Sequence, residues 1–125
     1  MSRILIVDDV ASARDAASRL LASEGHEVIT AENAWRALSV LEACPVDLVV
    51  LDLSLPGLDG FGFLDDVRRN PKWRNVRVVV MSGLQFCTEA YRQNTQLIRA
   101  WLAKGEASGA QLLDAVRGAL PSQAA

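Results

Sequence analysis

Short apolar runs alternate along the chain with longer segments in which apolar residues recur every three or four positions. The short runs predict β-strands, and the recurring pattern predicts helices that bury one face. Strands are expected over residues 3–7, 27–31, 48–51, 76–81 and 97–103. Helices are expected over residues 11–24, 34–42, 61–69, 87–94 and 108–120, and the pattern is weakest over 87–94.

Residues with special backbone or capping properties mark the expected ends of several helices. Gly25 follows the first helix, where a residue that tolerates positive φ commonly ends a helix. Asn33 precedes the second helix as an N-cap, and Pro45 follows its end. Ser108 begins the last helix.

Strands that alternate with helices of this length predict an α/β fold, with a parallel sheet covered on both faces. Because crossovers between parallel strands are right-handed, a five-stranded, doubly wound, flavodoxin-like sheet of order 2-1-3-4-5 is expected. At 125 residues the chain has the length of one domain. We expect that domain to span residues 1–121 and a short tail to follow at 122–125.

Polar residues stand where four of the expected strands end. They are Asp8 and Asp9, Asp52, Ser82 and Lys104. Carboxyl ends of parallel strands share one edge of a sheet, which is where such folds bind ligands. Three carboxylates and one ammonium leave two negative charges, which a divalent cation would cancel. Ligands that are all oxygen favour Mg²⁺, and the lack of His or Cys nearby disfavours Zn²⁺.

Composition narrows the range of functions. The net charge of −2 offers no basic surface for nucleic acid, so no direct nucleic-acid contact is expected. No apolar run approaches the length needed to cross a bilayer, and a strand pattern starts at Arg3 without room for a signal peptide. The expected location is therefore the cytoplasm, without membrane association. Cys44 and Cys87 fit no metal or redox spacing and are expected to be reduced thiols.

Three segments carry a resemblance to a known family: ILIVDD at 4–9, LDLSLPGLDG at 51–60 and MSG at 81–83. Together with Lys104, they resemble the receiver domains of bacterial response regulators, the chemotaxis-regulator-like proteins of two-component signalling. The resemblance covers nearly the whole chain. It implies that Asp52 accepts a phosphoryl group. It also implies that Asp9, Asp52 and the backbone carbonyl of Ser54 bind Mg²⁺, with Asp8 holding the metal through water.

The resemblance assigns further roles around the acceptor. Ser82 and Lys104 receive the phosphoryl oxygens, and Ser82 and Trp101 form the conformational switch. The implied partners are a sensor histidine kinase or a histidine phosphotransfer protein, and a downstream protein target. The chain is then a phosphoryl acceptor rather than an enzyme, with slow self-dephosphorylation at most.

Departures from the family fall on the fifth strand and its surroundings. Trp101 stands where Tyr or Phe is usual, and Gly105 rather than a cis-proline follows Lys104. The segment 94–99 also lacks the usual small turn. These departures keep one alternative open, a receiver-like adapter that acts without phosphorylation.

Two enzyme or cofactor classes fit less well. Aspartyl phosphatases carry a second acid two residues after the nucleophile, where this chain has Ser54. They also carry a cap insertion, which this chain lacks. A flavin carrier would be disfavoured by Asp8 and Asp9, since they repel a flavin phosphate. Of the remaining residues, His26 is expected to be exposed and without a role. Trp35 and Trp73 suit packing or partner contact equally.

Overall fold

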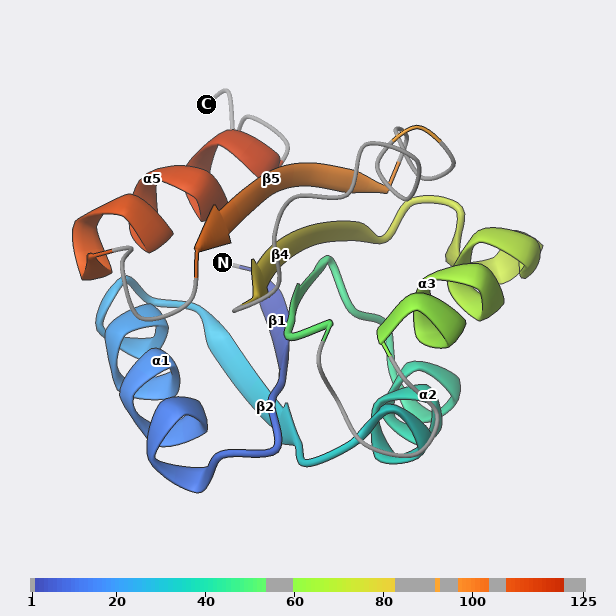
Figure 1. The fold of residues 1–125 in the computed structure, drawn as a ribbon, viewed down its shortest axis with the longest axis horizontal. Coiled ribbons are helices and arrows are strands. Elements are labelled where there is room, and N and C mark those ends of the chain that lie inside the picture. Colours follow the sequence, from blue (N-terminus) through green and yellow to red (C-terminus); the bar gives the residue numbers. More distant parts are fainter. Residues whose placement is uncertain (1, 54–59, 83–91, 93–96, 104–107, 121–125) are drawn as a thin grey trace.

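The computed structural model describes residues 2–53, 60–82, 92, 97–103 and 108–120. Its centre is a five-stranded parallel sheet of order β2-β1-β3-β4-β5, which confirms the predicted topology (Figure 1). The strands are β1 (Arg3–Val7), β2 (Glu27–Ala31), β3 (Leu48–Leu51), β4 (Arg77–Ser82) and β5 (Ile98–Ala103).

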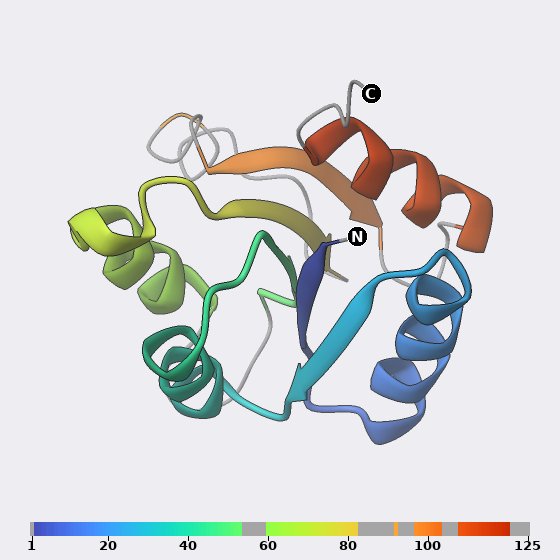
Figure 2. The same cartoon turned by 180° about the vertical axis from the view of Figure 1, so that it is seen from behind.

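Helices cover both faces of this sheet. One face carries α1 (Ala11–Ser23) and α5 (Gly109–Ala119), and the other carries α2 (Ala34–Ala43), α3 (Gly60–Arg69) and the short 3₁₀ helix η1 (Pro71–Trp73) (Figures 1 and 2). Each predicted helix in the described part of the chain is present. The helix expected over 87–94 lies outside the described residues, except for Arg92.

The continuous apolar runs of β1 and β3 arise because both faces of these strands are buried. In β3, Leu48 and Val50 pack under α1 and α5, while Val49 and Leu51 pack under α2 and α3. All four side chains are buried, so the run shows no alternation of apolar and polar residues. The two layers of core fix the central strands and hence the residues at their ends.

The structure shows the burial of three residues for which the sequence led either to no prediction or to a wrong one. Trp73 closes η1 and is buried in the core beneath α2 and α3, whereas Trp35 on α2 is exposed. The expectation that His26 is exposed is wrong. Its side chain is half-buried, and its Nδ1 atom has no hydrogen-bond partner in the described structure.

The predicted N-cap Asn33 is confirmed by a hydrogen bond, and Ser108, predicted to begin the last helix, is the N-cap of α5. The Arg36 amide donates to Asn33 Oδ1 (2.8 Å) at the start of α2. At the start of α5, the Gln111 amide donates to Ser108 Oγ (3.2 Å) and the Ser108 amide donates to Gln111 Oε1 (2.7 Å). This reciprocal pair is a capping box, which satisfies two amides at the start of the helix.

Gly25 and Gly118 make a matched pair for testing the backbone. Gly25 has φ of 88°, whereas Gly118 lies within α5, and an added Cβ would meet no atom within 4 Å at either position. We expect Gly25→Ala to lower the free energy of unfolding by about 1–2 kcal/mol, because a side chain disfavours positive φ. Gly118→Ala should raise it by about 0.5–1 kcal/mol, because alanine stabilises a helix. Urea unfolding followed by circular dichroism measures both, and a loss of stability in both variants would contradict this account.

Among the helices that the structure describes, none is both long enough and apolar enough to cross a membrane.

Candidate functional site

The register of the sheet brings the ends of β1 and β3 together. Val7 pairs with Leu51 in parallel strands, so Asp8 and Asp52 leave the sheet side by side. The ladder continues one residue further, because the Asp52 amide donates to the Val7 carbonyl (3.0 Å) and the Asp8 amide donates to the Ala31 carbonyl (3.1 Å). The backbone of both aspartates is therefore held by the neighbouring strands.

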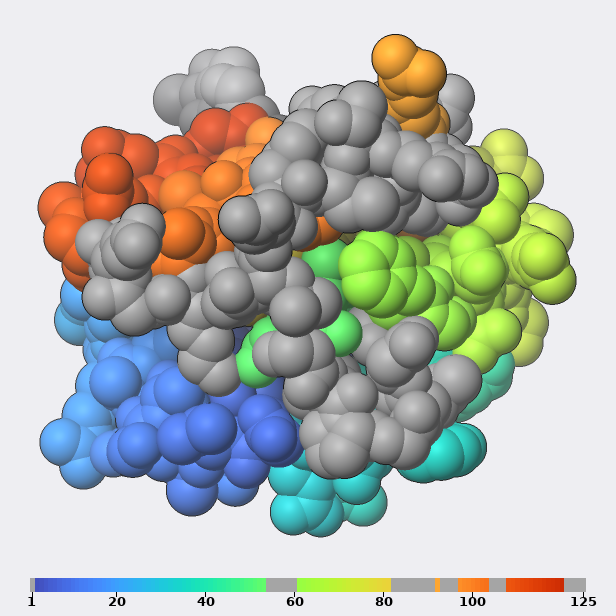
Figure 3. Space-filling model, viewed as in Figure 1, coloured from blue at the N-terminus to red at the C-terminus, as the bar shows by residue number. Residues whose placement is uncertain are grey.

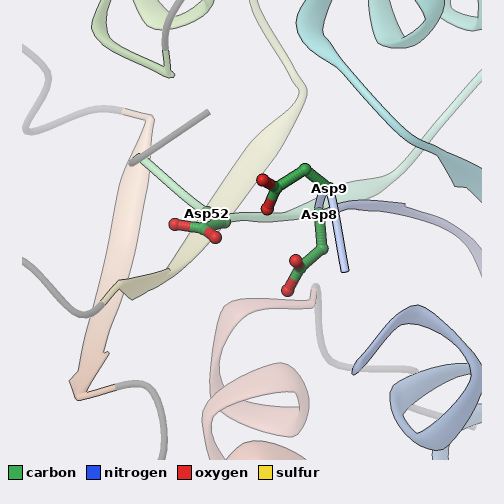
Figure 4. A group of neighbouring side chains, drawn as sticks. All are labelled: Asp8, Asp9 and Asp52. Atoms are coloured by element: carbon green, nitrogen blue, oxygen red, sulfur yellow. The ribbon is translucent and has the colours of Figure 1, made fainter. Parts of the chain in front are cut away.

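Asp8, Asp9 and Asp52 form one cluster of carboxylates at this edge (Figure 4). One oxygen atom from each residue lies within 4.8 Å of the others. Asp8 and Asp52 expose only 8% and 2% of their surface, whereas Asp9 is exposed. In Figure 4 the side chain of Asp9 reaches toward that of Asp52, and the Asp8 carboxylate lies below them in the view. The cluster is thus anchored in the protein and open to solvent on the side of Asp9.

Hydrogen bonds hold Asp8 at the start of α1. Its Oδ1 accepts from the Val10 amide (2.9 Å), and its backbone carbonyl accepts from Arg14 Nη1 (2.8 Å). Val10, the N-cap of α1, provides no side-chain cap. Arg14 was not among the residues predicted for the site. Its place in the first turn after an acidic pair was the available signal, since helix geometry turns that residue back toward the strand end.

The donor set of the cluster fits a hard divalent cation. Carboxylates this close repel one another, and a bound cation relieves that repulsion. Mg²⁺ is commonly held by one or two carboxylates and otherwise keeps its water. The exposed side of Asp9 leaves room for such water and for a ligand.

The remaining predicted site residues are placed only in part. Ser82 ends β4 and pairs with Ala103 on β5, at the same edge of the sheet as Asp52, but its side chain is not among those described. Ser54 and Lys104 lie outside the described residues. Trp101 lies on β5 opposite Val80, is half-buried, and packs against the core on the α2 and α3 side. The structure therefore brings together the three aspartates.

Comparison with known families decides what kind of domain carries this cluster. Residues 4–117 match the response regulator receiver domain. The chain belongs to this family. It is a receiver domain of two-component signalling systems, as the resemblance in its sequence implied, and the acidic cluster of such domains is the place where Mg²⁺ binds and a phosphoryl group is accepted.

One curated relative is the probable transcriptional regulator ycf27 of Pyropia yezoensis. It is 39% identical over 82 residues, which make up 66% of this chain and 32% of that protein. The chain thus covers about a third of the length of that relative.

Solved structures share the fold over nearly the whole receiver domain. The chemotaxis protein CheY4 of Vibrio cholerae has a TM-score of 0.85 at 24% identity and covers 96% of this chain and 99% of its own. The response regulator TrrA of Thermotoga maritima, solved with Mg²⁺ and beryllofluoride, has a TM-score of 0.77 at 28% identity. That match covers 94% of this chain and 97% of TrrA. These similarities agree with the observed strand order.

Proposed function

We propose that this receiver domain accepts a phosphoryl group on Asp52 in a reaction that requires Mg²⁺. The observation that carries the proposal is the cluster of Asp8, Asp9 and Asp52 at the carboxyl edge of a receiver-type sheet. Asp52 is the most buried of the three, and its backbone is fixed by β1. It therefore presents a carboxylate in a defined position.

Asp9 and Asp52 would hold the metal directly, together with the backbone carbonyl of Ser54, and Asp8 would hold it through water. The position of Asp8 supports its indirect role, because its Oδ1 already accepts a hydrogen bond from the Val10 amide. When bound, Mg²⁺ supplies positive charge to the transferring phosphoryl oxygens.

In phosphoryl transfer the protein mainly aligns the reacting groups and stabilises their charge, and it contributes little covalent chemistry. An oxygen of Asp52 attacks the phosphorus of a phosphohistidine. The P–O bond forms, the P–N bond breaks, and the imidazole of the donor leaves. Ser82 and Lys104 would receive the phosphoryl oxygens, and the strand order supports this role because β4, which ends in Ser82, lies next to β3.

The expected donor is a sensor histidine kinase or a histidine phosphotransfer protein, and the expected output is altered binding to a downstream protein. We place this exchange in the cytoplasm, without direct contact to nucleic acid or membrane. The domain acts as an acceptor and not as an enzyme in its own right. A receiver-like adapter that never uses phosphorylation is disfavoured by the complete acidic cluster.

Intact mass spectrometry tests the proposal. The protein is incubated with a small acyl phosphate such as acetyl phosphate, with Mg²⁺ or with a chelator. We expect the mass of one phosphoryl group to appear only with Mg²⁺. No gain under any condition with a divalent ion would favour the adapter, and an equal gain with the chelator would contradict the role of the metal.

A second prediction concerns the switch formed by Ser82 and Trp101. A hydrogen bond from the Ser82 hydroxyl to a charged phosphoryl oxygen contributes roughly 1.5–3 kcal/mol. That is enough to change the ratio of two conformational populations by about ten- to a hundredfold. We therefore expect Ser82→Ala to accept the phosphoryl group but to show only a small conformational change. The measurement is an NMR comparison with and without fluoroberyllate in the presence of Mg²⁺. In the parent protein, shifts should extend from Asp52 to Ser82 and Trp101, and shifts confined to Asp52 and its neighbours in the sequence would contradict a switch.

A further inference from the structure

The exposed indole of Trp35 stands out on the face of the domain that α2 and α3 cover. Trp35 leaves 59% of its surface in water, more than any other large apolar side chain that the structure describes. A single exposed apolar residue is ordinary, but a tryptophan at the rim of a hollow is typical of a binding surface. Trp35 lies on such a rim.

The hollow lies between α2 and α3 and has a volume of about 700 Å³. Its α2 side is built from Trp35, Leu38, Ser39 and Glu42, which follow the spacing of one helix face. Trp73 of η1 contributes to the opposite side. Figure 3 shows α2 and α3 on the side of the molecule away from α1 and α5, so the hollow and the α1–α5 surface are separate. Grooves between two helices commonly receive a segment from a partner.

The charges around the hollow indicate what such a segment carries. Its described lining includes the carboxylates of Glu42 and Asp66 and no basic side chain. Glu42 Oε2 lies 3.4 Å from Lys72 Nζ. Both side chains are largely exposed, so this ion pair is weak. The last turn of α2 contains no basic residue, so the negative end of its dipole adds to the two carboxylates.

From these features we propose that the hollow between α2 and α3 docks a short segment of a partner protein that presents an apolar side chain next to an arginine. The apolar side chain packs between Trp35 and Trp73, and the arginine lies near Glu42 and Asp66. Arginine suits this place better than lysine, because its planar group stacks on an indole and binds a carboxylate through two hydrogen bonds. The proposal does not depend on phosphorylation of Asp52.

Two synthetic peptides test the surface. One is an amphipathic helix with leucine and arginine on a single face, and the other replaces each arginine with glutamate. Both are titrated into the labelled full chain and followed by NMR, with Mg²⁺ in excess so that the acidic cluster is screened. We expect the arginine peptide to shift the resonances of α2, η1 and the Trp35 indole, and to bind at least about tenfold more tightly than the glutamate peptide.

Variants decide whether the residues act as proposed. Trp35→Ser should weaken binding of the arginine peptide by about thirtyfold, as the loss of an anchor residue does. Glu42→Gln combined with Asp66→Asn should weaken it by roughly fivefold. Asp15→Asn removes an exposed carboxylate on α1 that pairs with Arg19, and should change nothing. Circular dichroism verifies that each variant is folded.

Three outcomes would overturn the proposal. The first is equal binding of both peptides, or binding that Trp35→Ser does not change. The second is a set of shifts limited to the edge that carries Asp9 and Asp52, which would assign the peptide to the acidic cluster. The third is self-association of the protein alone that disappears in Trp35→Ser, measured by sedimentation, which would make a second copy of the chain the occupant.

Discussion

Asp52→Asn should gain no phosphoryl group from acetyl phosphate under conditions in which the parent protein is labelled. An amide lacks the charged oxygen that attacks phosphorus, so the acceptor is lost rather than weakened. Asn is close to Asp in size and keeps the backbone amide that donates to the Val7 carbonyl (3.0 Å), so the local fold should persist. Intact mass spectrometry in the presence of Mg²⁺ measures the result.

Asp15→Asn is the matched control for this substitution. Asp15 lies on α1, and its exposed carboxylate pairs with Arg19 (3.0 Å). This variant loses the same charge but should be labelled like the parent protein. Labelling of Asp52→Asn to the level of the parent would show that another residue accepts the phosphoryl group.

Asp9→Asn should weaken Mg²⁺ binding at least about tenfold, because a hard cation loses a charged ligand. For the parent protein, Mg²⁺ at a hundred times its dissociation constant should stabilise the fold by about 2.7 kcal/mol. At the same concentration the variant should gain far less. Thermal unfolding at several Mg²⁺ concentrations measures this difference without any transfer reaction.

The same experiment without metal provides an independent check. In the absence of Mg²⁺, Asp9→Asn should be at least as stable as the parent, since it removes one of three carboxylates that repel one another. A variant that is less stable without Mg²⁺, yet gains as much from the metal as the parent does, would contradict the proposed ligand set.

Much of the fold could be predicted because the strands carry sharp signals at both ends. The bounds expected for the first three strands, 3–7, 27–31 and 48–51, match β1, β2 and β3. The run 48–51 stops at Asp52, so an abrupt change from apolar to charged residues located both the strand and the candidate acceptor. The strand order was predicted from right-handed crossovers together with the doubly wound fold. The meeting of Asp8, Asp9 and Asp52 was predicted because the carboxyl ends of parallel strands share one edge of the sheet.

Other features depend on packing that a linear pattern does not contain. The fourth strand was expected from residue 76, but the Val76 amide donates to the Trp73 carbonyl (3.0 Å), which keeps Val76 in the turn after η1. His26 follows a glycine and was expected in water, yet its side chain is half-buried. For Trp35 and Trp73, the sequence could not distinguish an exposed indole from a buried one, because each follows a local pattern that suits either place.

Chemical mapping of the labelled residue tests the central claim most directly. The parent protein is incubated with Mg²⁺ and acetyl phosphate and then reduced with borohydride, which converts an aspartyl phosphate to homoserine. Peptide mass spectrometry then locates the modified residue. We predict homoserine at position 52 and unchanged aspartate at positions 8 and 9, with no homoserine when Mg²⁺ is removed. Homoserine at another position, or its absence from a protein that has gained phosphoryl mass, would contradict Asp52 as the acceptor.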